Sequence, residues 1–324
     1  MEMNKKVVVL GGGTGMSALV RGLKQFPVDV TAIVSVCDDG RSTGKLRKEF
    51  NQPAVGDIRR VLIALSETEP LMGELFNYRF NTTSDLNGHT VGNLFLTAMA
   101  TITGNMSDGI EAIGKVFNLK GKVLPLTEDN VVLMSKMTDG SVVEGEHNIT
   151  HAGMYEGKVI KRVYYKEKPV VNEKAIKAIQ EADLIILSMG SVYTSIIPNL
   201  ICKDIIKAID NSKATIMYTC NMMTQPGETD DFKASDHVKL LNSYLGKRKI
   251  DVVVGNVEKI SDEYIEKYAT EEQKDPVIFD IENLKKCKVD LVTEDLVTIE
   301  NDNTVKHDVT KLGLAIFSYM LRNK

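Results

Sequence analysis

The stretch Val7-Val8-Val9-Leu10-Gly11-Gly12-Gly13-Thr14-Gly15-Met16-Ser17 decides the fold. A short apolar run passes directly into a glycine-rich turn, and a helical pattern then begins with Leu19, Leu23 and Phe26 as its apolar positions. This order predicts a strand, a loop and a helix whose N-terminus offers unpaired N–H groups and the positive end of a dipole. Glycines also let the backbone approach an anion closely. The stretch therefore predicts a crevice for a nucleotide or another phosphate-bearing ligand, with candidate residues Gly11, Gly12, Gly13, Thr14 and Gly15.

The glycine loop is a weak signal when taken alone. Gly11 and Gly13 begin a dinucleotide-binding fingerprint, but Met16 occupies the position of its third glycine. A tight strand–helix turn without a ligand remains an alternative, and NAD is less favoured than another nucleotide. A second glycine stretch, residues 40–45, imitates a P-loop. It is one residue short between its glycines and has Leu46 where the metal-binding hydroxyl belongs, so we reject that assignment.

Composition limits the classes of function. The 324 residues are 43% hydrophobic and 26% charged, which is ordinary for a globular protein. A net charge of -4 and a pI near 5.8 argue against a general nucleic-acid binder. The longest apolar runs are strand-sized, so no membrane span is predicted. Four scattered cysteines without a CxxC pair are typical of a reduced, cytoplasmic protein.

Apolar runs rich in Val and Ile alternate with helical patterns along the chain. Runs that are apolar throughout are typical of strands covered on both faces of a parallel sheet, and they predict strands at 7–10, 30–36, 184–188, 214–218, 252–254 and 289–292. The predicted helices are 16–26, 58–66, 89–103, 107–117, 173–182, 200–210, 235–246 and 308–321. The alternation predicts an α/β fold, Rossmann-like and doubly wound, with a mostly parallel sheet.

Two segments depart from this alternation. Residues 123–168 contain strand-like runs separated by the turn dipeptides Asp139-Gly140 and Glu156-Gly157, which predicts an inserted antiparallel β region. Residues 258–288 are charged and weakly periodic, and we predict a lid or an edge element there. No internal repeat or low-complexity linker is found. The simplest prediction is one domain over residues 1–324.

Two adjacent acids, Asp38 and Asp39, follow the second predicted strand. An acid at this place in a Rossmann unit commonly bonds a ribose hydroxyl. One carboxylate can face the crevice, toward a metal such as Mg²⁺, a sugar or a substrate hydroxyl, while the other anchors the turn. The alternative is that both only accept backbone N–H bonds in that turn. Both acids are therefore candidates for ligand binding, metal binding and catalysis.

Two further blocks place polar residues at predicted helix starts. Asp57 is a plausible N-cap, and Arg59 or Arg60 can reach a phosphate through the planar guanidinium. His89 and Asn93 lie one helical turn apart and can share a face, although a histidine at a helix start is more often a cap or a packed ring.

Two hydroxyl-rich blocks follow predicted strands, at residues 188–195 and 219–229. Both therefore lie at the carboxyl edge of the sheet, where open α/β folds bind ligands. Cys220 has no evident base partner, so a buried structural thiol is favoured over a nucleophile. His147 and His151 are four residues apart but fall in the strand-like insertion. The candidate residues of the two blocks are Ser191, Tyr193, Thr194, Asn221 and Thr224.

Together the blocks resemble the family that contains the bacterial gluconeogenesis factor and, more distantly, 2-phospho-L-lactate transferase. The resemblance spans about residues 6–320. Its matching blocks are Gly11-Gly12-Gly13-Thr14-Gly15, Asp38-Asp39-Gly40, Gly56-Asp57-Ile58-Arg59, Gly88-His89-Thr90-Val91-Gly92-Asn93, the run from Gly190 to Ser195 and the run from Asn221 to Thr229. One departure is Arg41, which stands where the family usually has a second glycine. Its side chain can fill part of the crevice or contact phosphate.

The resemblance implies a regulatory protein that binds a UDP-sugar, notably UDP-N-acetylglucosamine, and supports growth on gluconeogenic carbon sources and cell-wall shape. Gly12, Gly13 and Thr14 would line the diphosphate, and Asn221 and Thr224 would close the crevice. Tyr268 and Lys306 are the nearest placements of a tyrosine and a basic residue that the family associates with the UDP-sugar.

Two alternative functions and two expected kinds of partner accompany this interpretation. The transferase branch implies phospholactyl transfer with a divalent metal in the Asp38-Asp39 region. An NAD(P)-dependent oxidoreductase is the least favoured class, because the third fingerprint glycine is absent. A homo-oligomer and a regulatory protein partner of unknown identity are further expectations.

Overall fold

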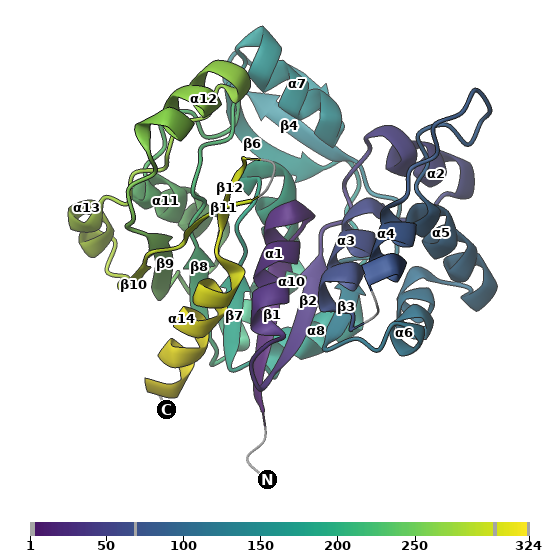
Figure 1. Ribbon diagram of the computed structural model, residues 1–324, viewed down its shortest axis with the longest axis horizontal. Helices are drawn as coiled ribbons and strands as arrows, with labels where there is room; N and C mark the ends of the chain where they lie inside the picture. Colours follow the sequence, from purple (N-terminus) through teal and green to yellow (C-terminus); the bar gives the residue numbers. More distant parts are fainter. Residues whose placement is uncertain (1–3, 68–69, 301–302, 323–324) are drawn as a thin grey trace.

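A parallel sheet forms the centre of the molecule (Figure 1). The computed structural model describes residues 4–67, 70–300 and 303–322, and in these ranges the large sheet has seven strands in the order β10-β9-β8-β7-β1-β2-β3. Every neighbouring pair is parallel. The strands are β1 (Lys5–Gly11), β2 (Val28–Val34), β3 (Lys122–Pro125), β7 (Leu184–Leu187), β8 (Thr215–Thr219), β9 (Val252–Asn256) and β10 (Asp290–Glu294). The predicted Rossmann-like α/β fold and its six predicted strands are confirmed.

The central strands are apolar because helices cover both of their faces. Val7 and Val9 of β1 and Ile185 and Ile186 of β7 have no exposed surface. Figure 1 shows α1 (Gly13–Leu23), α3 (Gly56–Leu65) and α14 (Val309–Arg322) in front of the sheet, with α8 (Glu173–Gln180) and α10 (Lys203–Asn211) behind it. Also predicted and observed are α5 (Val91–Thr103), α6 (Met106–Val116) and α11 (Ala234–Tyr244). No helix in the described ranges is long and apolar enough to cross a membrane.

The predicted antiparallel region is present, with different limits and an additional helix. Strands β4 (Leu133–Met137), β5 (Val142–Glu144) and β6 (Ile160–Tyr165) form a sheet in the order β5-β4-β6. Residues 122–125, however, belong to the large sheet as β3. Helix α7 (Glu146–Glu156) lies between β5 and β6, so His147 and His151 are on a helix and not on a strand. Its sequence has almost no apolar face, which is why helical periodicity did not reveal it.

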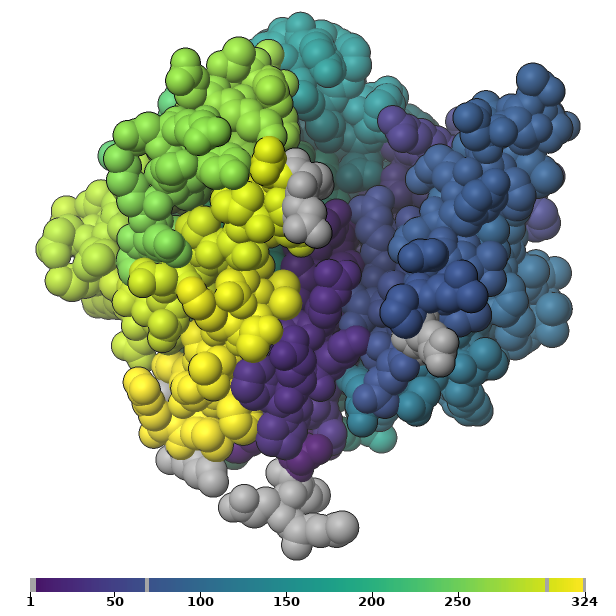
Figure 2. Space-filling model, viewed as in Figure 1, coloured from purple at the N-terminus to yellow at the C-terminus, as the bar shows by residue number. Residues whose placement is uncertain are grey.

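Several short elements were not predicted. They are α2 (Arg41–Phe50), α4 (Pro70–Asn77), the π-helical turn η1 (Val192–Ile196), α9 (Ile197–Leu200), and the strand pair β11 (Val297–Ile299) and β12 (Val305–His307). The segment 258–288 contains α12 (Asp262–Glu272) and α13 (Ile281–Lys286). α12 and α7 both lie at the end of the molecule toward which β1 points (Figure 1), and Figure 2 shows their light-green and teal surfaces at that end.

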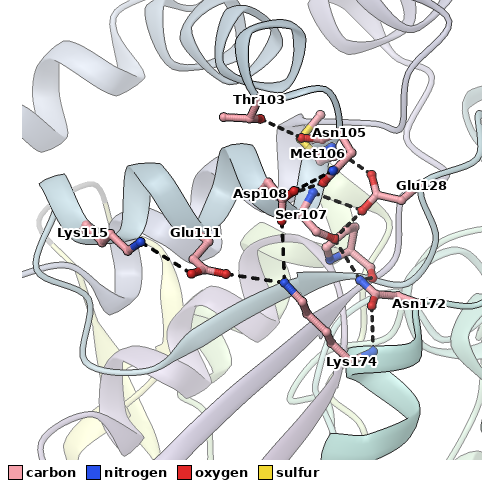
Figure 3. A network of polar contacts seen from close by, with 11 residues as sticks. Thr103, Asn105, Met106, Ser107, Asp108, Glu111, Lys115, Glu128, Asn172 and Lys174 are labelled. Atoms are coloured by element: carbon pink, nitrogen blue, oxygen red, sulfur yellow. Dashed lines mark hydrogen bonds and ion pairs between the residues drawn. The ribbon is translucent and has the colours of Figure 1, made fainter.

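A polar network fixes the outer end of the sheet (Figure 3). The carboxylate of Glu128, just after β3, accepts hydrogen bonds from the backbone N–H groups of Met106 and Ser107 at 2.9 and 3.0 Å. Asn172, before α8, donates to the Ser107 hydroxyl at 3.0 Å and to the Pro125 carbonyl at 3.2 Å. Edge strand β3 is therefore held between the start of α6 and the start of α8.

Arg41 begins α2 in a backbone conformation that favours glycine. Its φ is +42°, and its side chain is exposed. An L-residue in the left-handed region costs about 1–2 kcal/mol. Glycine avoids this cost but loses more conformational entropy on folding, so the net gain in stability is smaller. We expect Arg41→Gly to raise the free energy of unfolding by about 1 kcal/mol in urea titrations. Lys45→Gly, inside the same helix, should lower it by about 1 kcal/mol. A loss of stability in both variants would contradict the account.

Candidate functional site

The glycine loop at the end of β1 already holds an anionic group. The backbone N–H of Gly13, the first residue of α1, donates to the Asp57 carboxylate at 2.6 Å. A β carbon on Gly12 would lie 2.6 Å from the same oxygen, so a side chain at Gly12 would exclude Asp57. The positive end of a helix dipole and its free N–H groups attract anions in this position. The start of α1 is thus an anion-binding position with a carboxylate bound to it.

Asp57 reaches this position from the first turn of α3. The N-cap of α3 is Val55, so the prediction that Asp57 caps this helix is wrong. Burial raises the pKa of Asp57 to about 6, in spite of Arg60, whose guanidinium lies 3.4 Å from the carboxylate; Asp38 raises it further. At neutral pH this carboxylate is ionised at a free-energy cost.

The two acids after β2 have different partners. Asp38 accepts a hydrogen bond from the Gly40 N–H at 3.0 Å and anchors its own turn. Its other oxygen would lie 2.6 Å from a β carbon on Gly56, so α3 can approach only because Gly56 has no side chain. Asp39 accepts from the N–H of His147 at 2.9 Å, at the start of α7. Both acids accept backbone N–H bonds, but Asp39 does so across to the antiparallel region.

Two further carboxyl groups, Glu146 and Glu228, complete the acidic surroundings. Burial raises the pKa of Glu146 well above its usual value, and the charges of Asp38, Asp57, Asp39 and Glu228 raise it further. Burial likewise raises the pKa of Glu228 to about 7. Glu228 belongs to a block that the sequence singled out, whereas nothing in the sequence marked Glu146. Glu146 therefore interacts electrostatically with four other carboxyl groups near the glycine loop.

The loops after β7 and β8 lie beside the glycine loop and form the rim of the predicted crevice. The Asn221 side chain accepts from the Gly190 N–H at 3.0 Å and donates to the Gly190 carbonyl at 2.6 Å. A β carbon on Gly190 would be 3.7 Å from the Gly12 carbonyl, and one on Gly15 only 2.0 Å from the Met189 carbonyl. The approach of α1 to the loop after β7 therefore depends on Gly15, whereas the contact at Gly190 is an ordinary one.

The block after β7 continues into η1, a π-helical turn of a kind that is frequent at functional sites. Ser191 caps it: its hydroxyl accepts from the Thr194 N–H at 3.0 Å and the Thr194 hydroxyl at 2.7 Å. The same hydroxyl donates to Glu228, which also accepts from the Tyr193 N–H at 3.3 Å. Ser191 and Thr194 thus join the crevice rim to Glu228, while the Tyr193 side chain is buried.

Three predicted residues have partners outside the glycine loop. Thr224 exchanges hydrogen bonds with Asp275 at 2.7 and 2.9 Å, and so fastens the segment that precedes α13. The buried Tyr268 hydroxyl of α12 accepts from the Val305 N–H at 2.9 Å, and Lys306 forms an ion pair with Glu300 at 3.4 Å. Tyr268 and Lys306 are brought close together through β12.

Arg59 and Asn93 lie at a separate junction where α2, α3 and α5 begin. Asn93 donates to the Ser42 hydroxyl at 3.2 Å, and this hydroxyl lies 3.0 Å from Nδ1 of His89. Arg59 donates to the Phe76 carbonyl and to the Asn77 side chain. Arg59 Nε is buried and has no hydrogen-bond partner among the described residues. The sequence did not indicate that these residues would group apart from the glycine loop.

A cavity of about 510 Å³ opens next to Asn221, between the ends of β8 and β9. Its walls are mostly apolar and include Met222, Val257 and Phe279. Residues 258–260, 265, 276–279 and 281 line it, so the segment predicted as a lid or edge element forms one wall. Its volume lies within the range of small-molecule sites.

The sequence profile of the 2-phospho-L-lactate transferase CofD family matches residues 7–297. This chain belongs to that family. It is 47% identical to the gluconeogenesis factor of Bacillus subtilis (strain 168), with 97% of each chain covered. It is 45% identical to the gluconeogenesis factor of Halalkalibacterium halodurans, with 96% of this chain and 95% of that protein covered. A crystal structure of a Bacillus halodurans protein matches with a TM-score of 0.92 at 45% identity, over 97% of this chain and 99% of that one. The resemblance inferred from the sequence blocks is confirmed.

The transferase name of the family raises the question of a metal. Within residues 4–67, 70–300 and 303–322, no three His, Cys, Asp or Glu side chains are grouped so that they hold a metal ion. Mg²⁺ usually keeps several waters and binds through one or two carboxylates plus phosphate oxygens of a ligand. Asp38 and Asp39 therefore fit Mg²⁺ only as a cation shared with a bound phosphate.

Proposed function

We propose that this protein is a regulatory protein that binds a nucleotide sugar of the UDP-N-acetylglucosamine type at the glycine loop. The observation that carries the proposal is the bond from Gly13 to Asp57 at the start of α1, because it identifies a backbone donor that already accommodates an anion. A diphosphate oxygen matches this donor in charge and geometry. Gly12 and Thr14 would contribute the rest of the diphosphate contact.

The surroundings of the loop favour a ligand rich in hydroxyl groups. Asp38, Asp39 and Glu146 supply carboxylate oxygens, which accept hydrogen bonds from ribose and hexose hydroxyls. The cavity beside Asn221 supplies apolar walls for a flat base. A nucleotide sugar combines all three kinds of group, whereas inorganic phosphate uses only the first.

A sensing role is supported better than turnover. Cys220 borders the cavity, but burial raises the pKa of its thiol to about 12, so it supplies no thiolate at neutral pH. The two relatives described above are named for gluconeogenesis. We extend this role to the present chain, together with support of cell-wall morphogenesis.

A second candidate function is a metal-dependent phospho-ligand transferase. It is favoured by the family name and by Asp38 and Asp39 after β2, which fit a divalent cation that is shared with a bound phosphate. In this case Arg60, 3.4 Å from Asp57, would stabilise charge that develops on the phosphoryl group.

Calorimetric titration with UDP-N-acetylglucosamine, with and without Mg²⁺, tests both candidates. We expect saturable binding and recovery of the intact nucleotide sugar after prolonged incubation. N-acetylglucosamine 1-phosphate, which lacks the uridine, and NADH, a dinucleotide without uridine or N-acetylglucosamine, serve as comparison ligands. Absence of binding would reject the sensor, and recovery of a cleaved nucleotide that depends on Mg²⁺ would establish the transferase instead.

A further inference from the structure

A second large depression lies at the opposite edge of the sheet. This groove, of about 1130 Å³, is formed by the first residues of β1, β2 and β3 together with α6, α8 and the end of α1. Val8 is the lining residue of β1 nearest to the glycine loop, and a strand rises about 3.3 Å per residue, so the groove begins about 10 Å from Gly11 along β1. Both can be occupied at the same time.

The groove carries more positive than negative charge although the chain is acidic. Seven lysines and three acidic residues line it, and Glu67 and Asp108 next to it pair with Lys120 and Lys174 at 3.3 and 3.7 Å, so an excess of two positive charges remains in a chain whose net charge is -4. The lysines come from β1, the end of α1, α6, the β3 segment and α8. Positive charge is therefore concentrated here and attracts anionic partners over a distance.

The few carboxylates in the groove are shared between lysines. Glu111 lies 3.6 Å from Lys115 and 3.5 Å from Lys174, and Figure 3 shows it between the two ammonium groups. Glu181 is shared in the same way by Lys6 at 2.8 Å and Lys177 at 3.8 Å. Exposed ion pairs of this kind contribute little, so the ammonium groups can change partners.

The lysine of the edge strand is held less closely than the others. Lys122 of β3 is exposed and forms no ion pair among the described residues, although Glu181 attracts it from a greater distance. The groove is also lined by apolar side chains, among them Phe26, Ile110 and Leu119. A single phosphate needs donors that converge on one point, whereas the lysines of the groove come from several elements, and four of them pair with two different carboxylates, Glu111 and Glu181.

We propose that this groove binds an acidic segment of a partner protein, in which Asp or Glu side chains alternate with apolar ones. The carboxylates pair with the lysines of α6, β3 and α8, and the apolar side chains fill the positions between them. Phe26 is the only aromatic residue among those that line the groove in the described ranges, so it offers little stacking surface for nucleic-acid bases. The proposal is independent of the ligand at the glycine loop.

Peptide display tests the proposal. A library of random twelve-residue peptides is selected against the full chain and against Lys115→Glu/Lys122→Glu/Lys177→Glu, three exposed positions of the groove. The matched control is Lys285→Glu/Lys286→Glu/Lys288→Glu at α13, which changes the charge by the same amount. We expect acidic peptides to be enriched on the unmodified chain and on the control. In fluorescence anisotropy they should bind the groove variant at least tenfold more weakly.

The possible outcomes separate this proposal from the proposed function. Acidic peptides that bind the groove variant as tightly as the control, or no acidic enrichment at all, would overturn it. Saturable binding of tripolyphosphate without peptide selection would also overturn it, in favour of a small polyanion. All three proteins should bind UDP-N-acetylglucosamine with the same affinity. If none of them bound it, the proposed nucleotide site would be rejected, and the proposal for the groove would be unaffected.

Discussion

Asp57→Asn is expected to tighten the binding of UDP-N-acetylglucosamine about tenfold at pH 8 in the absence of Mg²⁺. The Asp57 carboxylate occupies the Gly13 N–H that the diphosphate needs, and at pH 8 it is ionised because its pKa is about 6. The amide keeps the shape of the side chain but removes the negative charge. A change of about 1.4 kcal/mol in the repulsion corresponds to tenfold in affinity. Calorimetric titration measures the change.

The pH dependence gives an independent check of the same prediction. Below pH 6 the Asp57 carboxyl of the unmodified chain gains a proton, so its affinity should rise as the pH falls from 8 to 5.5. Asp57→Asn should respond less over this range. Asp29→Asn, at the exposed amino end of β2, is the control and should leave both affinity and slope unchanged. Weaker binding by Asp57→Asn without Mg²⁺ would mean that the carboxylate attracts the ligand.

The second large effect is expected for Gly15→Ala. The new β carbon would lie 2.0 Å from the Met189 carbonyl oxygen, which is a backbone atom and cannot turn aside. Helix α1 must therefore move away from the loop after β7. Inserting a methyl group into a packed site costs about 1–3 kcal/mol, and we expect a loss of about 3 kcal/mol in urea unfolding. Nucleotide affinity should fall about 100-fold.

Gly73→Ala provides the matched control for this variant. Gly73 lies inside α4, and its β carbon would meet only a methyl group of Ile63 at 3.8 Å. Alanine has the higher helix propensity, so stability should stay the same or rise by up to about 1 kcal/mol. If Gly15→Ala retained both the stability and the affinity of the unmodified chain, α1 would not be seated against β7 as described. Circular dichroism shows whether the variant remains folded.

The parallel sheet could be predicted because its signal is local. Val7 to Leu10 and Leu184 to Leu187 are continuous apolar runs, and each run carries enough information to predict a buried strand. α2 and α7 were missed for the converse reason. The Arg41–Phe50 segment is highly charged, and α7 has hardly any apolar face, so tertiary contacts decide their structure.

Only the residues of the candidate site that belong to sequence motifs could be predicted. The glycine loop, Asp38 and Asn221 follow strands, and the geometry of a parallel sheet brings strand ends together. Glu146 joins them from the start of helix α7, and no spacing along the chain indicates that approach. In the same way, the sequence offers no sign that Asp57 turns toward α1 instead of capping its own helix.

The paired hydrogen bonds between Asn221 and Gly190 have a consequence for the energetics of ligand entry. A side-chain amide that binds both backbone groups of one residue continues the hydrogen-bonding of neighbouring strands past their ends. The rim of the crevice is therefore immobilised during folding, before any ligand arrives. A ligand that binds there does not have to order a mobile loop, so its affinity is not reduced by the entropic cost of ordering.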